Sequence, residues 1–146
     1  MRKITENLYL GDRHSAPSDT NLRISCAEEI FYNVCSQKQD IFWDLNEPAV
    51  YYRFEDYPNF KTMDVGPVND AIEQIEKNIA TKKIYVHCLW GVNRSASIVF
   101  MYLVRNKLIP GDNYKESQNA FWEIYPDHSP NPGWKEFLIK NYPYNF

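Results

Sequence analysis

The sequence predicts a single compact α/β domain, with a central, twisted and mostly parallel β-sheet flanked by helices. Short apolar stretches typical of strands alternate with stretches whose apolar residues recur every three or four positions, as in amphipathic helices. The chain has 146 residues, which is enough for one domain with a sizeable hydrophobic core. We therefore expect residues 1–146 to form one domain.

The first half of the chain is predicted to form mainly strands. Residues 3–11 alternate loosely and end at a glycine, which predicts an opening strand. Residues 22–27 form a second candidate after a turn-rich segment, and residues 49–56 form a firmer one. Residues 40–45 fit either a short strand or an aromatic loop. Pro58 places the segment that follows residue 56 in a loop.

Helical patterns dominate the second half. An amphipathic helix is predicted after Asp64 by apolar residues at steps of three and four: Val65, Val68, Ile72, Ile75 and Ile79. Residues 83–88 return to an apolar strand, and the nearly uniform apolar run at 96–104 predicts a helix buried on most sides. The sequence GDN at 111–113 ends that helix and can cap the next one. A proline-rich loop leads to a last short helix at 133–142.

Composition excludes several classes of protein. The net charge of −3 and the pI of about 5.6 argue against a general nucleic-acid-binding function. No apolar run approaches membrane-spanning length, and the first residues lack the apolar region of a signal peptide, so we expect an intracellular, cytoplasmic protein. Three cysteines without a CxxC pair, and three scattered histidines, predict neither a disulfide framework nor a metal site.

The stretch HCLWGVNRS, from His87 to Ser95, lies where an apolar strand changes to an apolar helix. Backbone N–H groups and the helix dipole converge at such a junction and favour a bound anion. Arg94 can offer a planar fork to two phosphate oxygens, and Gly91 permits an unusual backbone angle. In the same field the Cys88 thiol should ionise easily. A cysteine after a strand is often only a small core residue, but these neighbours favour a nucleophile in a phosphate-binding loop.

This stretch resembles the HC-x5-R-[ST] signature of cysteine-based protein tyrosine phosphatases. The chain's size and the order of four motifs resemble the dual-specificity branch of that superfamily. The motifs are LYLG at 8–11, FED before a proline at 54–56, the signature itself, and NPGW at 131–134. Residues 31–48 show no resemblance. Low-molecular-weight phosphatases and arsenate reductases carry the loop near the N-terminus, which argues against those families.

The resemblance implies a role for each matching residue. Cys88 would attack phosphorus, Ser95 would ease departure of its sulfur, and His87 would orient the loop through a backbone hydrogen bond. Asp56, which is 32 residues before Cys88, would be the general acid. Its rivals are Glu55, which would face the other side of a strand, and Asp64, which more simply caps a helix.

The loop itself would bind phosphate through Leu89, Trp90, Gly91, Val92, Asn93 and Arg94. Asn93 would hold the loop by side-chain hydrogen bonds. Trp90 would either stack on a phosphotyrosine ring at the rim of the cleft or pack inward as core. Cys26 ends the strand at 22–27, and its counterpart in several phosphatases of the superfamily is a redox partner for the nucleophile. The alternative is that Cys26 is simply a buried small residue.

The expected partners are proteins phosphorylated on tyrosine, and on serine or threonine if the cleft is shallow. No cofactor or metal is required. Two other enzyme functions stay open: an RNA 5′-triphosphatase, which shares the loop and Asn93, and a phosphoinositide phosphatase, although Leu89 and Trp90 are neutral where lipid phosphatases often have lysines. A phosphate-binding pseudophosphatase scaffold is the alternative without catalysis.

Overall fold

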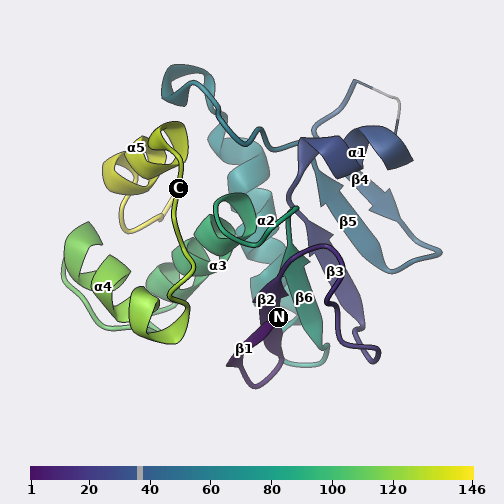
Figure 1. Ribbon diagram of the computed structural model, residues 1–146, viewed down its shortest axis with the longest axis horizontal. Helices are drawn as coiled ribbons and strands as arrows, with labels where there is room; N and C mark the ends of the chain where they lie inside the picture. The colour runs from purple at the N-terminus through teal and green to yellow at the C-terminus, as the bar shows by residue number, and fades with distance from the viewer. Residues whose placement is uncertain (36–37) are drawn as a thin grey trace.

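The computed structural model describes residues 1–35 and 38–146, and its centre is a six-stranded sheet in the order β1-β2-β6-β3-β5-β4 (Figure 1). The strands are β1 (Arg2–Thr5), β2 (Leu8–Gly11), β3 (Leu22–Ser25), β4 (Ile41–Asp44), β5 (Ala49–Tyr52) and β6 (Ile84–His87). The four central strands are parallel to one another, and only the two edge strands run antiparallel. The prediction of a mostly parallel α/β sheet is confirmed.

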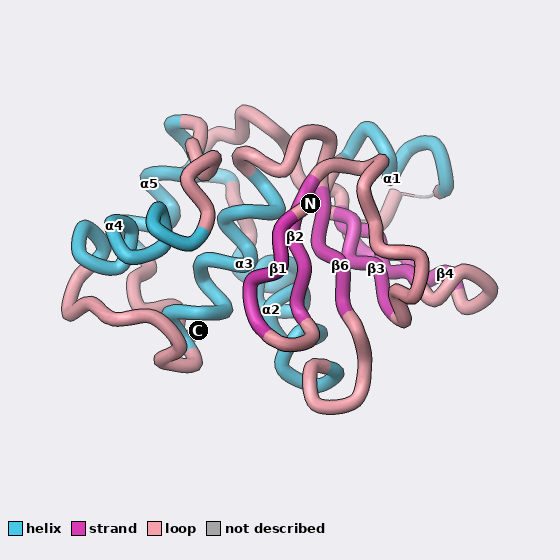
Figure 2. The backbone as a smooth tube through the Cα atoms, turned by 60° about the horizontal axis from the view of Figure 1, so that its bottom comes forward, coloured by secondary structure: helices cyan, strands magenta, loops and turns pink. Residues whose placement is uncertain are grey.

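Helices cover both faces of this sheet unequally (Figure 2). The helices are α1 (Glu28–Val34), α2 (Val65–Asn78), α3 (Arg94–Arg105), α4 (Tyr114–Ile124) and α5 (Pro132–Lys140). A small cluster joins Phe31 of α1 to Ala49 and Tyr51 of β5 on one face. The larger core lies on the opposite face, where α3 packs against β2, β6 and the other three helices.

Helix α3 is the centre of that larger core. Every residue from Arg94 to Val104 is buried, as its nearly uniform apolar sequence predicts. Because α3 begins directly after the loop that follows β6, the loop is anchored by a fully buried strand and by the most buried of the described helices. The remaining described helices have one buried stripe each. No helix in the described part of the chain has both the length and the apolar character that a membrane span needs.

Two predicted strand boundaries were wrong, and one helix was missed. Residues 3–11 form two strands rather than one, because a turn at Glu6 and Asn7 folds them into a hairpin. The strand predicted at 49–56 ends at Tyr52, so Glu55 and Asp56 lie in a loop. Helix α1 was not predicted at all. By contrast, residues 40–45 do contain a strand, β4.

The predicted helix caps are confirmed. The carboxylate of Asp64 accepts a hydrogen bond from the backbone N–H of Gly66 at the start of α2 (2.9 Å). The side chain of Asn113 accepts one from the N–H of Glu116 at the start of α4 (2.9 Å). Each bond satisfies a donor that the first turn of a helix leaves free.

Candidate active site

Cys88 lies at the carboxyl end of β6, at the base of the loop that leads into α3. Its sulfur accepts hydrogen bonds from the backbone N–H of Gly91 (3.3 Å) and from the Ser95 hydroxyl (3.2 Å). Burial opposes ionisation of the thiol, but these hydrogen bonds and the charge of Arg94 outweigh it, so the pKa of Cys88 is lowered. The structure thus favours a thiolate at this position.

Gly91 has a backbone conformation and surroundings that other residues would not tolerate. Its φ of +73° lies in the left-handed region, and an added Cβ would come within 2.7 Å of the Gly11 backbone. The Tyr125 hydroxyl also donates a hydrogen bond to the Gly91 carbonyl (2.7 Å). The loop is therefore fixed against both β2 and the residue that follows α4.

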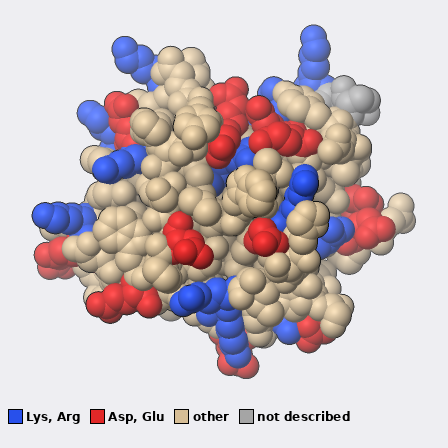
Figure 3. Space-filling view, in the orientation of Figure 1, with Lys and Arg blue, Asp and Glu red and all other residues tan. Residues whose placement is uncertain are grey.

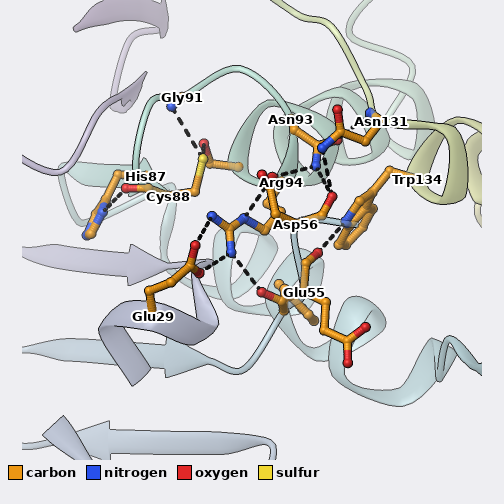
Figure 4. A network of polar contacts seen from close by, with 12 residues as sticks. Glu29, Glu55, Asp56, His87, Cys88, Gly91, Asn93, Arg94, Asn131 and Trp134 are labelled. Carbon is orange, nitrogen blue, oxygen red and sulfur yellow. Dashed lines mark hydrogen bonds and ion pairs between the residues drawn. The ribbon is translucent and has the colours of Figure 1, made fainter. Parts of the chain in front are cut away.

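Arg94 is buried, and its guanidinium points toward the carboxylates of Glu29 and Asp56 (Figure 4). Nη1 donates to Glu29 Oε1 (2.5 Å) and to the Phe54 carbonyl (3.0 Å), while Nη2 donates to Glu29 Oε2 (3.2 Å). Nε is the one guanidinium nitrogen left without a hydrogen bond within the described residues. A buried donor without a partner is costly, and an oxyanion beside Cys88 would supply that partner.

Asp56 lies next to this donor, with its side chain 40% exposed and Oδ1 at 3.5 Å from Arg94 Nε. The side-chain amide of Asn93 donates to both Oδ1 (2.9 Å) and the backbone carbonyl (2.8 Å) of Asp56. Asn131 donates to the same carbonyl (2.8 Å), and its own N–H donates to Asn93 Oδ1 (2.8 Å). Asn93 therefore links the loop after β6, the loop of Asp56 and the start of α5.

The two other candidates for the general acid, Glu55 and Asp64, do not face Arg94. The Asp64 carboxylate caps α2. The Glu55 carboxylate extends away from Cys88 and Arg94, while its backbone carbonyl accepts a hydrogen bond from Trp134 Nε1 (2.8 Å; Figure 4). Of these three acids, Asp56 is the one whose carboxylate faces the guanidinium of Arg94.

His87 and Trp90 have opposite environments. His87 is buried with Nδ1 at 3.2 Å from the Cys88 carbonyl, and its ring stacks on Tyr85. Burial lowers the pKa of His87 to about 4, so the ring is neutral at neutral pH. Trp90 is 78% exposed, which overturns the alternative that it packs inward as core. Leu89 and Val92 are half-buried beside it.

Cys26 and Cys88 lie at the ends of neighbouring strands. Ser25 of β3 pairs with His87 of β6, and the N–H of Cys26 donates to the His87 carbonyl (2.8 Å). Burial, with the nearby Cys88, raises the pKa of the Cys26 thiol well above its usual value. Both cysteines are free, and Cys35 lies in the other core cluster. The structure thus brings together the pair that the sequence suggested.

Three residues of this site were not singled out from the sequence. Glu29 lies just after the strand predicted at 22–27 and is 65 residues from Arg94 in the chain. Tyr125 contacts the loop only through tertiary structure. Asn131 is part of the NPGW motif, to which we assigned no chemistry, and that motif was the one available signal for its role.

Comparisons with known proteins find relatives among phosphatases. A family model described as the catalytic domain of dual specificity phosphatases matches residues 9–142. The chain is 28% identical over 94 residues to MAP kinase phosphatase with leucine-rich repeats protein 3 of Dictyostelium discoideum, covering 62% of this chain and 10% of that protein. It is 38% identical over 69 residues to tyrosine-protein phosphatase MSG5 of Saccharomyces cerevisiae, covering 42% of this chain and 14% of that protein. The chain thus spans a small part of these relatives' length.

The fold is also that of a solved phosphatase structure. The crystal structure of DUSP15 superposes with a TM-score of 0.70 at 20% sequence identity. The match covers 97% of this chain and 86% of that chain.

Proposed function

The chain belongs to the family of dual specificity phosphatase catalytic domains, and on this premise we propose that it hydrolyses phosphotyrosine, phosphoserine and phosphothreonine in proteins through a phosphocysteine intermediate. One observation carries the proposal. The Cys88 sulfur accepts two hydrogen bonds, and the buried Nε–H of Arg94 forms no hydrogen bond among the described residues, with Asp56 Oδ1 3.5 Å away, so that an oxyanion could accept it. A thiolate and an anion-binding donor are the two groups that the reaction needs first.

In the first step the Cys88 thiolate forms a bond to phosphorus as the bond from phosphorus to the leaving oxygen breaks. Protonated Asp56 gives its proton to that oxygen, so a neutral phenol or alcohol departs. Arg94 and the backbone amides of residues 89–94 stabilise the equatorial phosphate oxygens. The hydrogen bonds from Asn93 and Asn131 hold Asp56 in place for this transfer.

In the second step water attacks the phosphocysteine. The Asp56 carboxylate takes a proton from that water, and the phosphorus–sulfur bond breaks to release inorganic phosphate and the Cys88 thiolate. The Ser95 hydroxyl, which already donates to the sulfur, stabilises the departing thiolate. Nδ1 of neutral His87 donates a hydrogen bond to the Cys88 carbonyl in both steps, which holds the start of the loop. The scheme uses neither a metal nor a cofactor.

The main test compares Cys88→Ser with Cys35→Ser on phosphotyrosine and phosphothreonine peptides, a phosphoinositide and triphosphorylated RNA. Cys88→Ser should abolish turnover and still bind phosphopeptide, whereas Cys35→Ser, the same change in the other core cluster, should retain turnover. Asp56→Asn should slow esters with poor leaving groups by about 10²–10⁴-fold. Turnover by Cys88→Ser would refute the mechanism, and turnover of RNA or lipid alone would refute the substrate class.

A further inference from the structure

A cavity lies behind the loop that carries Asp56. It has a volume of about 160 Å³ and is walled by apolar side chains, including Phe54, Met63, Pro67 and Trp134. One water molecule takes roughly 30 Å³ in the liquid, so the cavity has room for a side chain. It lies between the 53–58 segment, the first turn of α2 and α5.

The charged groups that line this cavity are mainly acidic. They are Asp40, Arg53, Glu55 and Asp64. Arg53 pairs with Asp40 (2.5 Å), so these two charges offset each other. Glu55 and Asp64 form no ion pair with any lysine or arginine that the structure describes. The cavity therefore has two carboxylates without a cationic partner above an apolar wall.

Further acidic side chains lie between this cavity and Arg94. The N–H of Glu28 donates to the Phe54 carbonyl (3.0 Å), which places the start of α1 beside the same loop. Burial and the neighbouring charges of Glu55 and Glu29 raise the pKa of Glu28, as expected where carboxylates crowd together. Acidic side chains gather near the top of the face in Figure 3, where Figure 1 places this loop and the start of α1.

One strip of backbone borders both the cavity and the guanidinium of Arg94. The Phe54 carbonyl accepts a hydrogen bond from Arg94 on one side, while Phe54 also lines the cavity on the other. Glu55 faces away from Cys88, and the next residue, Asp56, faces Arg94 (Figure 4). A peptide whose phosphate contacts Arg94 therefore has this strip, and the cavity behind it, as its neighbour.

We propose that this cavity binds the side chain of a lysine or arginine that flanks the phosphorylated residue of the substrate. The methylene groups of such a side chain suit the wall of Met63, Pro67 and Trp134, and its cationic end suits Glu55 and Asp64. The proposal rests on the proposed function, because it adds a sequence preference to the same phosphoprotein substrates. It predicts basic phosphorylation sites as the preferred ones.

The test measures binding of fluorescent phosphotyrosine peptides to the Cys88→Ser protein, so that no turnover is needed. An arginine is placed at each flanking position in turn and compared with alanine and glutamate. At one position or more, arginine should bind more tightly than alanine, by roughly two- to fivefold for each partly exposed ion pair formed. In the same background, Glu55→Gln and Asp64→Asn should each reduce that ratio, and asparagine still caps α2.

The matched control is Glu123→Gln, the same chemical change on α4, which does not line the cavity. It should leave the ratio unchanged, and Glu55→Lys should invert it in favour of glutamate peptides. Equal binding of arginine and alanine peptides at every position would overturn the proposal, as would a ratio that survives in the Glu55→Gln, Asp64→Asn double variant. Turnover of an aryl phosphate by the wild-type protein reports separately whether the proposed function holds.

Discussion

Replacing Gly133 by alanine should slow the departure of poor leaving groups, because the new methyl group would collide with the loop that carries Asp56, the proposed general acid. A Cβ at this position would lie 2.1 Å from the Pro58 carbonyl oxygen, whereas ordinary contacts begin near 3.4 Å. The obstacle is backbone rather than a flexible side chain, so the loop and α5 must separate by more than about 1 Å.

That separation should reach Asp56, which is two residues before Pro58. The hydrogen bonds from Asn131 to the Asp56 carbonyl and from Trp134 to the Glu55 carbonyl, both 2.8 Å, join the same two segments and would be stretched. A misplacement of about 1 Å costs on the order of 10² in rate when the group must transfer a proton. The expected loss is therefore about a hundredfold at most, and confined to reactions that need the proton.

The assay is steady-state hydrolysis of aryl phosphates whose leaving groups span a wide range of pKa. Gly133→Ala should leave kcat for good leaving groups nearly unchanged and lower it progressively for poor ones, the pattern also expected of Asp56→Asn. Gly66→Ala is the control, since its Cβ would meet only the Asp64 side chain at 3.3 Å. Wild-type rates for poor leaving groups, or one uniform loss across the series, would refute this reasoning.

Three other predictions concern Trp90, Cys26 and His128. Trp90→Ala should lower the preference for phosphotyrosine over phosphothreonine peptides if the exposed indole stacks on the substrate ring, and an unchanged kcat/KM ratio would exclude stacking. Mild peroxide should produce a Cys26–Cys88 linked peptide in non-reducing mapping, with activity restored by thiol, whereas sulfinic acid on Cys88 beside an untouched Cys26 would reject the pairing. Burial lowers the pKa of His128 to about 3, so the unfolded chain takes up this proton between about pH 6.5 and 3 and stability falls as pH falls through that window. Urea unfolding at several pH values should show a slope that His128→Gln reduces by up to about 1.4 kcal/mol per pH unit, and equal slopes would contradict the assignment.

Strong local patterns made much of the fold predictable. Strand β6 and helix α3 are continuous apolar runs, because both are buried on nearly all sides. Helix α2 shows its buried stripe at steps of three and four. Helix α1 has seven residues, one buried side chain and no side-chain cap, so it has too little periodicity to be seen in the sequence.

Within the site, too, residues close together in the chain could be predicted, whereas residues brought together only by the fold could not. Cys88, Gly91, Arg94 and Ser95 are close in the chain, and their spacing suggested a phosphate-binding loop because one strand-to-helix junction brings them together. Glu29 contacts Arg94 through three-dimensional packing alone, and nothing in the spacing of the two residues indicates the contact. Sequence patterns therefore indicated the groups proposed to act on phosphate, but not the distant residues Glu29, Tyr125 and Asn131 that hold them in place.

Those orienting contacts have a consequence for the order in which the protein folds. Glu29 and Arg94 are separated by 65 residues, Asp56 and Asn131 by 75, and Glu55 and Trp134 by 79. Contacts across such long loops form late, because the entropy of loop closure is lost before the contacts compensate for it. A refolding chain should then regain helical circular dichroism before it regains catalysis. Detachment of α5 alone would release the Asp56 loop while β6 and α3 stay packed, so inactivation can precede unfolding of the core.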